Sequence, residues 1–220
     1  MSTFSPTPAP AGSEETARQI ARVLLDVGAV AIDAQNPFTY ASGAKSPVYC
    51  DNRLLISYPD ERRRVIDAMV HLVSQEVGLG QFDVVAGVAT SGIPWAAWLA
   101  DALAKPMVYI RDAPKGHGKG RRVEGVLGPG QRAVVIEDLV TTGRSSLSAV
   151  EGARAAGAVV ERCIAIFSYE WAQAAAAFAE AGVQLSALSR ISTLLQVALT
   201  AGNISESDLN AVQAWVAEHS

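Results

Sequence analysis

Apolar and polar residues alternate in blocks along the chain, and these blocks predict strands that take turns with helices. Short, nearly continuous apolar runs predict buried strands at residues 83–88, 107–110, 133–136, 158–167 and 183–188. Apolar positions that recur at helical spacing predict helices at residues 61–77, 95–104, 144–156, 171–180, 190–200 and 205–217. Because strands and helices alternate, we expect an α/β fold, in which a parallel twisted sheet is flanked by helices.

The residues before this alternation have a different character. Residues 1–12 are rich in Pro, Ser, Thr and Ala, which predicts a disordered tail. Ser13 can cap a helix that Gly28 ends. Short strand candidates at 29–32 and 38–40 then predict a small β-rich hood. We therefore divide the chain into a tail, an N-terminal helix with its hood, and a core, which span residues 1–12, 13–58 and 59–220.

The predicted strand at 133–136 runs directly into two carboxylates, Glu137 and Asp138. A turn rich in hydroxyl groups follows, and the next helix begins there; these residues are Thr141, Thr142, Gly143, Arg144 and Ser145. In a parallel sheet, ligands bind at the carboxyl ends of strands. The amides of a helix N-terminus suit a phosphate, and the carboxylates suit sugar hydroxyls or a metal ion. The alternative is a plain turn with solvated acids, but such acids are costly beside a buried strand unless they are used.

A second polar turn, residues 90–94, follows the strand at 83–88. Ser91 and Gly92 stand where the strand ends and the next helix opens, so their amides are placed to hold an anion. A plain helix cap would have the same sequence.

Residues 111–122 interrupt the pattern, because they are rich in Gly and basic groups and carry no apolar periodicity. This composition predicts a flexible loop rather than a core element. Arg111, Lys115 and His117 offer cationic donors to a densely anionic ligand. An ordinary solvated basic loop is the alternative.

Composition narrows the class of protein. The net charge of −4 argues against general binding of nucleic acid. The two cysteines, Cys50 and Cys163, make neither a disulfide framework nor a zinc site, which favours a reducing cytoplasm. No apolar run approaches the roughly 20 residues of a membrane span. We expect a cytoplasmic protein that binds neither nucleic acid nor a membrane.

The segment VVIEDLVTTGRS at residues 134–145 resembles the motif for phosphoribosyl pyrophosphate (PRPP) in the type I phosphoribosyltransferase family. The resemblance implies that Glu137 and Asp138 meet the ribose hydroxyls of PRPP. It also implies that the turn binds the 5′-phosphate through Thr141, Thr142, Gly143, Arg144 and Ser145.

Three further segments resemble the members of that family that act on orotate. Residues 38–53 (FTYASG, KSPVY and DNR) are similar to their hood, 88–94 to their pyrophosphate-side loop, and 111–118 to their catalytic loop. The resemblance implies orotate binding by Ser46, Tyr49 and Thr141. It implies PRPP binding by Ser91, Gly92, Arg111, Lys115 and His117, in addition to the motif itself. Its implied catalytic residues are Arg111, Lys115, His117 and Asp138.

The resemblance further implies the reaction and its partners. PRPP and orotate would give orotidine 5′-monophosphate and pyrophosphate, a step of pyrimidine synthesis. Mg²⁺ would be the cofactor, held mainly through PRPP with no dedicated protein metal site. A homodimer with shared active sites is expected. The alternatives are a phosphoribosyltransferase for a purine base and a PRPP-binding regulator on the same fold.

The chain also departs from the pattern of some orotate enzymes. Basic residues found in them are replaced here by Ala41, Ser91 and Asp112, and no arginine ends the strand at 158–167. The sequence therefore leaves open which group binds the carboxylate of orotate.

Overall fold

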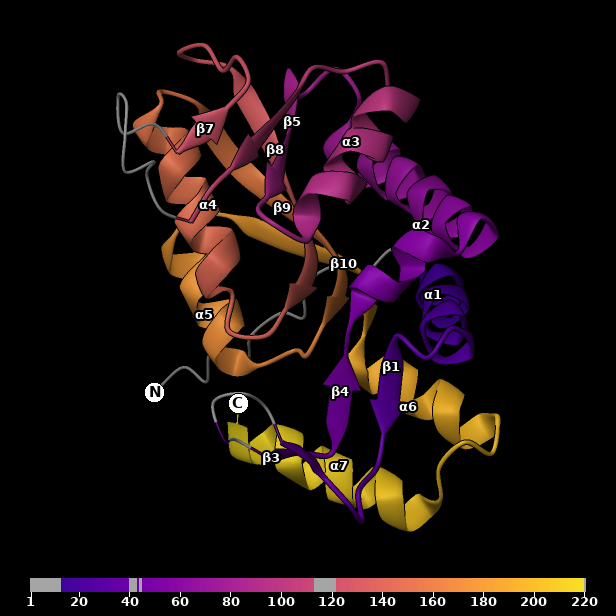
Figure 1. The fold of residues 1–220 in the computed structure, drawn as a ribbon. Coiled ribbons are helices and arrows are strands. Elements are labelled where there is room, and N and C mark those ends of the chain that lie inside the picture. The colour runs from indigo at the N-terminus through magenta and orange to yellow at the C-terminus, as the bar shows by residue number, and fades with distance from the viewer. Residues whose placement is uncertain (1–12, 40–42, 44, 113–121, 220) are drawn as a thin grey trace.

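The structure is a computed structural model of the 220-residue chain, and it describes residues 13–39, 43, 45–112 and 122–219. Six strands form one central sheet in the order β10-β9-β8-β5-β6-β7 (Figure 1). They are β5 (Val84–Val88), β6 (Met107–Ile110), β7 (Val123–Glu124), β8 (Arg132–Val140), β9 (Val159–Ser168) and β10 (Gln184–Arg190). All neighbours are parallel except the short edge strand β7, which runs antiparallel to β6. The predicted α/β fold is confirmed, with β7 as the one departure.

Helices cover both faces of the sheet, and each side has its own hydrophobic core. On one side pack α1 (Glu14–Asp26), α2 (Pro59–Leu72) with the π-helical turn η2 (Val73–Val77), α3 (Gly92–Ala102) and α6 (Ile191–Thr200). On the other side pack α4 (Arg144–Ala155) and α5 (Ala172–Glu180). Alternate residues of β8 enter the two cores, with Val134 and Ile136 on the first side and Val135 on the second, as the two-residue period of a strand requires. The acids that follow therefore leave a strand that is buried on both faces.

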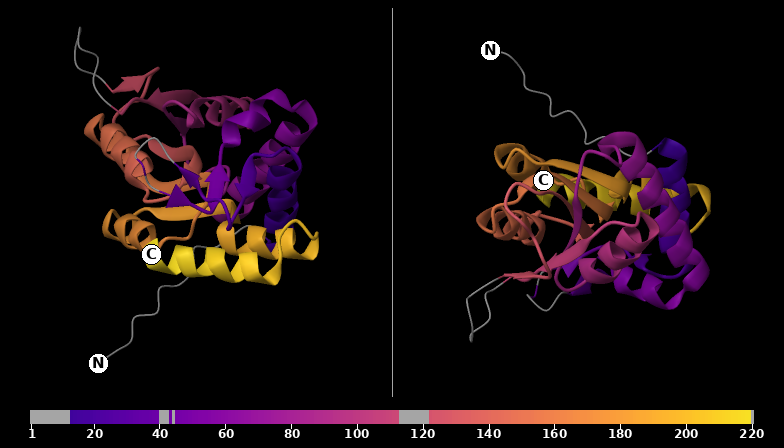
Figure 2. Two further views of the ribbon diagram at one scale, coloured as in Figure 1. Left: turned by 60° about the horizontal axis from the view of Figure 1, so that its bottom comes forward. Right: turned by 90° about the horizontal axis from the view of Figure 1, so that it is seen from above.

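The hood consists of two small antiparallel pairs, which lie beside one another at one end of the molecule. β1 (Val30–Ile32) pairs with β4 (Val48–Cys50), β2 (Phe38–Thr39) pairs with β3 (Lys45–Ser46), and the 3-10 helix η1 (Asn52–Ser57) leads from β4 to α2. The helix α7 (Glu206–His219) lies against the hood, as Figure 1 and the left view of Figure 2 show. Its Trp215 donates a hydrogen bond from Nε1 to the carbonyl of Lys45 at 3.3 Å and packs on Tyr169 and Trp171. The hood is thus fastened to the last helix.

Several element boundaries differ from the sequence prediction, and two of these differences lie beside the polar turns. β8 does not stop at Ile136 but continues through both acids to Val140, because β9 runs alongside and pairs Glu137 with Ala165 and Val140 with Ser168. α3 begins at Gly92 rather than at residue 95. The proline at position 94 falls in its first turn, where the missing amide hydrogen costs nothing. The predicted cap of α1 is confirmed, since Ser13 Oγ accepts from the amide of Thr16. Within the described ranges, no helix combines the length and the apolar character that crossing a membrane requires.

Candidate functional site

The candidate site lies at the carboxyl end of β8, a central strand of the sheet. Glu137 and Asp138 are followed by the turn at 141–143, and α4 begins at Arg144. Gly143 has a φ of 77°, and a side chain there would place its Cβ 2.8 Å from the ring of Phe178 on α5. Glycine is therefore required at this position both by the backbone and by the packing of α5. The sharp turn aims the N-terminus of α4 toward the acids.

Glu137 is turned inward, with only 4% of its surface exposed. Its carboxyl group accepts from Ser146 Oγ on α4 at 3.2 Å and from the backbone amide of Asp138 at 3.1 Å. Burial, and then the charge of Asp138, raises the pKa of Glu137 to about 9. Among the described residues, no ion pair offsets the desolvation of this carboxyl group, so it carries a proton at neutral pH. Glu137 acts in the free protein as a buried, neutral hydrogen-bonding group.

Asp138 is held on the side of the hood. The side chain of Asn52, which is 1% exposed, donates from Nδ2 to the Asp138 carbonyl at 2.6 Å. Burial raises the pKa of Asp138, while hydrogen bonds and the positive charge of Arg53 oppose that rise. Arg53 is itself fixed by Asp51 through two bonds, Nε to Oδ1 at 2.6 Å and Nη2 to Oδ2 at 2.7 Å. Two neighbouring acids therefore have different surroundings, Ser146 for one and the hood for the other.

The turn after the acids is open to an anion. Thr141 and Thr142 are half-buried, while Arg144 and Ser145 are exposed. Amides in the first turn of a helix lack intrahelical acceptors, and no side chain caps α4. The Arg144 amide reaches only a long contact of 3.5 Å with Thr142 Oγ1. Free amides, hydroxyl groups and a guanidinium group on a helix N-terminus are the donors that a phosphate needs.

Ser91 and Gly92 reach the same edge of the sheet, because β5 and β8 are parallel neighbours whose helices α3 and α4 both begin there. A Cβ at Gly92 would lie 2.5 Å from the Ile136 carbonyl oxygen. The glycine therefore lets α3 start directly against β8, beside Glu137. Ser91 makes no side-chain cap bond to α3.

Arg111 directly follows β6 and stands 3.7 Å from Glu124 of β7, measured from Nη1 to Oε1. It is partly buried, and both its backbone groups bond to Arg122. Lys115 and His117, and with them most of the predicted loop, lie outside the described residues. Their roles stay predictions.

The predicted orotate-binding residues of the hood differ in accessibility. Ser46 is fully buried, and its hydroxyl donates to the Val48 carbonyl at 2.6 Å and accepts from the Val48 amide. This hydroxyl therefore fixes the bend between β3 and β4. Tyr49 is 37% exposed, and its ring packs on Phe38 with centroids 5.7 Å apart. Tyr49 is the more accessible of the two to a ligand.

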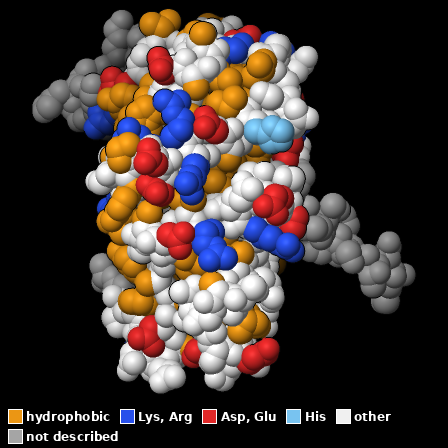
Figure 3. All heavy atoms as spheres, turned by 90° about the vertical axis from the view of Figure 1, so that its right-hand side faces the viewer, with side chains coloured by type: hydrophobic (Ala, Val, Ile, Leu, Met, Phe, Trp, Pro, Cys, Tyr) orange, Lys and Arg blue, Asp and Glu red, His pale blue; other side chains and the backbone are white. Residues whose placement is uncertain are grey.

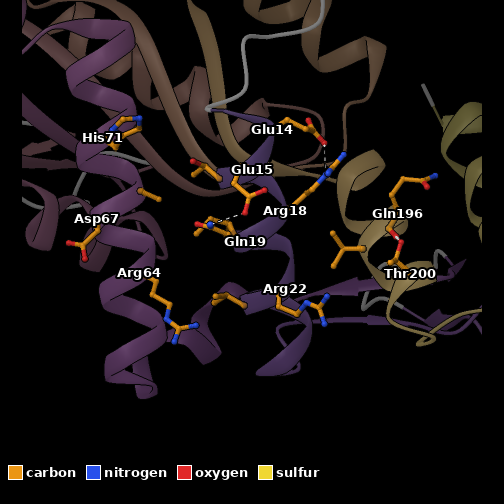
Figure 4. A pocket seen from close by; sticks show the side chains of 15 residues that line it. Glu14, Glu15, Arg18, Gln19, Arg22, Arg64, Asp67, His71, Gln196 and Thr200 are labelled. Carbon is orange, nitrogen blue, oxygen red and sulfur yellow. Dashed lines mark hydrogen bonds and ion pairs between the residues drawn. The ribbon is translucent and has the colours of Figure 1, made fainter.

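A groove of about 940 Å³ lies elsewhere, between α1, α2 and α6. Figure 3 shows acidic and basic side chains intermingled on this face, and Figure 4 shows them around the groove. Glu14 pairs there with Arg18, and Glu15 accepts from Gln19. None of the residues predicted to bind a substrate lines this groove, and its mixed charge selects no ligand of one sign.

The sequence reasoning missed two residues that hold the acids, Asn52 and Ser146. Asn52 belongs to the DNR segment of the hood, but its spacing gives no sign that it reaches a carbonyl 86 positions away. Ser146 stands in the first turn of α4, where a serine is ordinary. Neither residue is marked by a local sequence pattern, because each acts through a contact that only the folded chain creates.

Comparison with known proteins agrees with this geometry. The profile described as "Phosphoribosyl transferase domain" matches residues 59–175. The orotate phosphoribosyltransferase of Coxiella burnetii is 46% identical over 199 residues, which covers 90% of this chain and 94% of the relative. That of Enterococcus faecalis is 46% identical and covers 91% and 95%.

Two solved structures share the fold. The orotate phosphoribosyltransferase from Aeropyrum pernix has a TM-score of 0.72 at 34% identity, covering 84% of this chain and 99% of that one. The UMP synthase of Leishmania donovani has a TM-score of 0.78 at 26% identity, covering 93% of this chain but 43% of that longer one.

Proposed function

Because this chain belongs to the orotate phosphoribosyltransferase family, we propose that it transfers the 5-phosphoribosyl group from PRPP to orotate. The products are orotidine 5′-monophosphate and pyrophosphate, and the bond to the anomeric carbon passes from pyrophosphate oxygen to orotate N1. The single observation that carries this proposal is the acid pair on β8 directly before the uncapped N-terminus of α4. The assignment to orotate rests on the relatives.

The residues divide the work of this reaction. The turn of Thr141, Thr142, Gly143, Arg144 and Ser145 binds the 5′-phosphate. Asp138 and Glu137 hold the ribose hydroxyls, and the charge of Asp138 stabilises positive charge that develops on the ribose as pyrophosphate leaves. Ser91, Gly92, Arg111, Lys115 and His117 bind the pyrophosphate and neutralise its charge. Tyr49, Ser46 and Thr141 receive orotate.

Magnesium is proposed as the cofactor, carried mainly by the diphosphate. In the described residues, no three His, Cys, Asp or Glu side chains gather as ligands. The hard oxygen donor at the site is the Asp138 carboxylate, which suits an ion that keeps most of its ligands from phosphate and water. When bound, Mg²⁺ supplies positive charge that makes pyrophosphate a better leaving group.

The activity is tested by the loss of orotate absorbance on mixing protein, orotate, PRPP and Mg²⁺. Parallel mixtures replace orotate with adenine, guanine, hypoxanthine or xanthine, and pyrophosphate release is measured in each. We expect turnover of orotate at least 100-fold above that of any purine base, because buried polar groups left unpaired by the wrong base are costly. Release with a purine base alone would overturn the assignment to orotate. PRPP binding without release in any mixture would favour a PRPP-binding regulator.

We also propose a cytoplasmic homodimer whose active sites are shared. Cys50 and Cys163 are free thiols, as in a reducing compartment. Leu54 and Tyr58, four positions apart in sequence, keep 43% and 44% of their surface exposed, which supports an apolar contact with a second copy. Mixing Lys115→Ala protein with Asp138→Asn protein should restore part of the activity through one intact shared site. Absence of recovery in purified heterodimers would contradict shared sites.

A further inference from the structure

The backbone of Asp138 is held by the hood at a point where β8 has passed the end of its neighbour. The β5–β8 pairing ends at Gly87 and Ile136, whereas β8 continues through both acids to Val140. Asn52 of η1 donates from Nδ2 to the Asp138 carbonyl at 2.6 Å. A buried carbonyl group needs a donor, and here a side chain supplies what a neighbouring strand supplies elsewhere. The direction in which the Asp138 side chain leaves β8 therefore depends on the Asn52 amide.

The other end of the same amide is held by Cys50 of β4. The Cys50 thiol donates to Asn52 Oδ1 at 3.4 Å, and within the described ranges no second donor meets this oxygen. Burial, and then the charge of Asp138, raises the pKa of the thiol, so Cys50 keeps the proton that it donates. Successive side chains of β4 point to opposite faces, which directs Cys50 away from the side on which Tyr49 is exposed. The thiol therefore acts behind the proposed orotate position and not on the base.

The thiol selects one of two orientations of the Asn52 side chain. An asparagine amide has a donor end and an acceptor end, which change places when the group turns over. In the observed orientation Nδ2 meets a carbonyl oxygen and Oδ1 meets a thiol hydrogen. After a turn, Oδ1 would face the carbonyl oxygen of Asp138, with an acceptor against an acceptor. Because Asn52 is 1% exposed, water does not compensate such a mismatch.

We infer that Cys50 is a positioning residue, which orients the Asn52 amide and through it the Asp138 carboxylate toward the ribose of PRPP. We call Cys50, Asn52 and Asp138 the thiol relay. The relay lies in the hood and β8 of one chain and includes no residue of the 111–122 loop. It therefore operates whichever copy of the chain supplies Lys115 to a shared site. The inference rests on the proposed function, since it assigns Cys50 a task in that reaction.

The test compares Cys50→Ala and Cys50→Ser with Val30→Ala. Val30 is a matched control, because it is buried, faces Cys50 across the β1–β4 pair and makes no bond to the relay. We expect Cys50→Ala to lower kcat by about 3- to 10-fold with the KM for orotate unchanged, since a misplaced carboxylate loses transition-state contacts. Cys50→Ser keeps a donor and should retain kcat within about twofold.

The control variant should also retain kcat within about twofold, even if its melting temperature falls, because packing of the hood is changed and the relay is not. Equal kcat for Cys50→Ala and Val30→Ala would overturn the inference. A Cys50→Ser protein as slow as Cys50→Ala would overturn it as well, since the donor would then have no effect.

A double-mutant cycle tests whether Cys50 acts through Asn52. The variant Cys50→Ala, Asn52→Ala should be no slower than Asn52→Ala alone, because the amide to be oriented is already absent. Losses that multiply would mean that Cys50 acts independently, against the inference. The S–H stretching band in the infrared spectrum, assigned by its absence in Cys50→Ser, reports the bond itself. It should move to higher frequency in Asn52→Ala, and an unmoved band would contradict the relay.

PRPP affinity, measured by calorimetry with Mg²⁺ and without orotate, keeps this test apart from the proposed base. Should wild-type protein bind PRPP but not turn over orotate, the proposed function fails. The inference then stands if Cys50→Ala weakens PRPP binding and Val30→Ala does not, and it falls if both variants bind alike.

Discussion

The charged side chains at the two ends of β8 have opposite surroundings: an exposed ion pair lies at the amino end, and two buried acids lie at the carboxyl end. At the amino end, Arg132 meets Asp83 with its guanidinium group, with contacts of 3.1 and 3.3 Å, and its backbone amide donates to the same carboxylate at 2.8 Å. Both side chains are well exposed, and hydrogen bonds from Arg132 lower the pKa of Asp83. At the carboxyl end, two acids stand side by side with raised pKa values, and the positive charge of Arg53 of the hood opposes this rise for Asp138.

The charges at the amino end of β8 stabilise the fold, whereas the acids at its carboxyl end are available to a ligand. The amino end is self-contained, since opposite charges meet in solvent. The carboxyl end is electrostatically incomplete, because burial disfavours the charged forms of both acids and leaves Glu137 protonated in the free protein. Ribose hydroxyls and a magnesium-bound diphosphate would complete it. Variants at the two ends should therefore affect different measurements.

The largest effect is expected from Asp138→Asn. We expect kcat to fall about 100-fold or more, because a charge that stabilises the transition state is removed. Thermal stability should not fall, since the change removes a carboxylate whose burial disfavours its charged form. Steady-state kinetics and a melting curve on the same preparation check both parts. If Asp138→Asn lost stability but kept its activity, the carboxyl end of β8 would serve the fold in the same way as the amino end, which would contradict this prediction.

A smaller loss is expected from Asn52→Ala, which removes the donor to the Asp138 carbonyl. We expect about a tenfold loss of kcat through misplacement of the acid. The free energy of unfolding should fall by about 1–3 kcal/mol, since a buried carbonyl loses its partner. Asn203→Ala, at an exposed position, is the control for removing an amide side chain. Unchanged kinetics in Asn52→Ala would show that the hood does not hold Asp138.

The dependence of stability on pH should identify Glu137. Its pKa is raised from 4.5 to about 9 in the folded protein, so between these values the folded state keeps a proton that the unfolded chain has lost. Stability contributed by this group is full below pH 4.5 and is lost as the pH rises toward 9. Glu137→Gln, which cannot titrate, should flatten this part of the curve. Chemical denaturation at several pH values measures it, and parallel curves for both proteins would contradict a buried neutral Glu137.

The smallest effect is expected at the amino end, from Asp83→Ala. Exposed ion pairs contribute little to stability and are screened by salt. The melting temperature of the variant should therefore lie slightly below that of the wild-type protein at low ionic strength, and the two should agree in high salt. Activity should match wild type. A large loss of kcat here would mean that the amino end of β8 is coupled to the site after all.

Most of the fold follows from periodicity, because apolar runs such as 107–110 become strands wherever helices cover both faces. The sequence missed the extension of β8 through the acids because pairing with β9 is a tertiary contact, and propensity treats adjacent carboxylates as a strand end. It also missed β7, since two residues carry no period.

The sequence predicts the part of the site that is formed by neighbours in the chain, and it does not predict contacts between distant residues. The acids, the glycine turn and the helix start are neighbours in sequence, so their spacing identifies them. Asn52 and Ser146 act on a carbonyl and a carboxyl group that no local pattern marks. The hydroxyl of Ser46 forms hydrogen bonds with the backbone of Val48 inside the hood, and its role toward orotate stays a prediction.

The hydrogen bond from Trp215 to the Lys45 carbonyl also has a consequence for the order in which parts of the chain fold during synthesis. On the ribosome, Lys45 is made early and Trp215 follows 170 residues later. During this interval the core can fold, since domains form as their residues emerge. The hood is therefore fixed last, and a nascent chain stalled before α7 would have β8 and α4 in place while its hood still lacked the contact with Trp215.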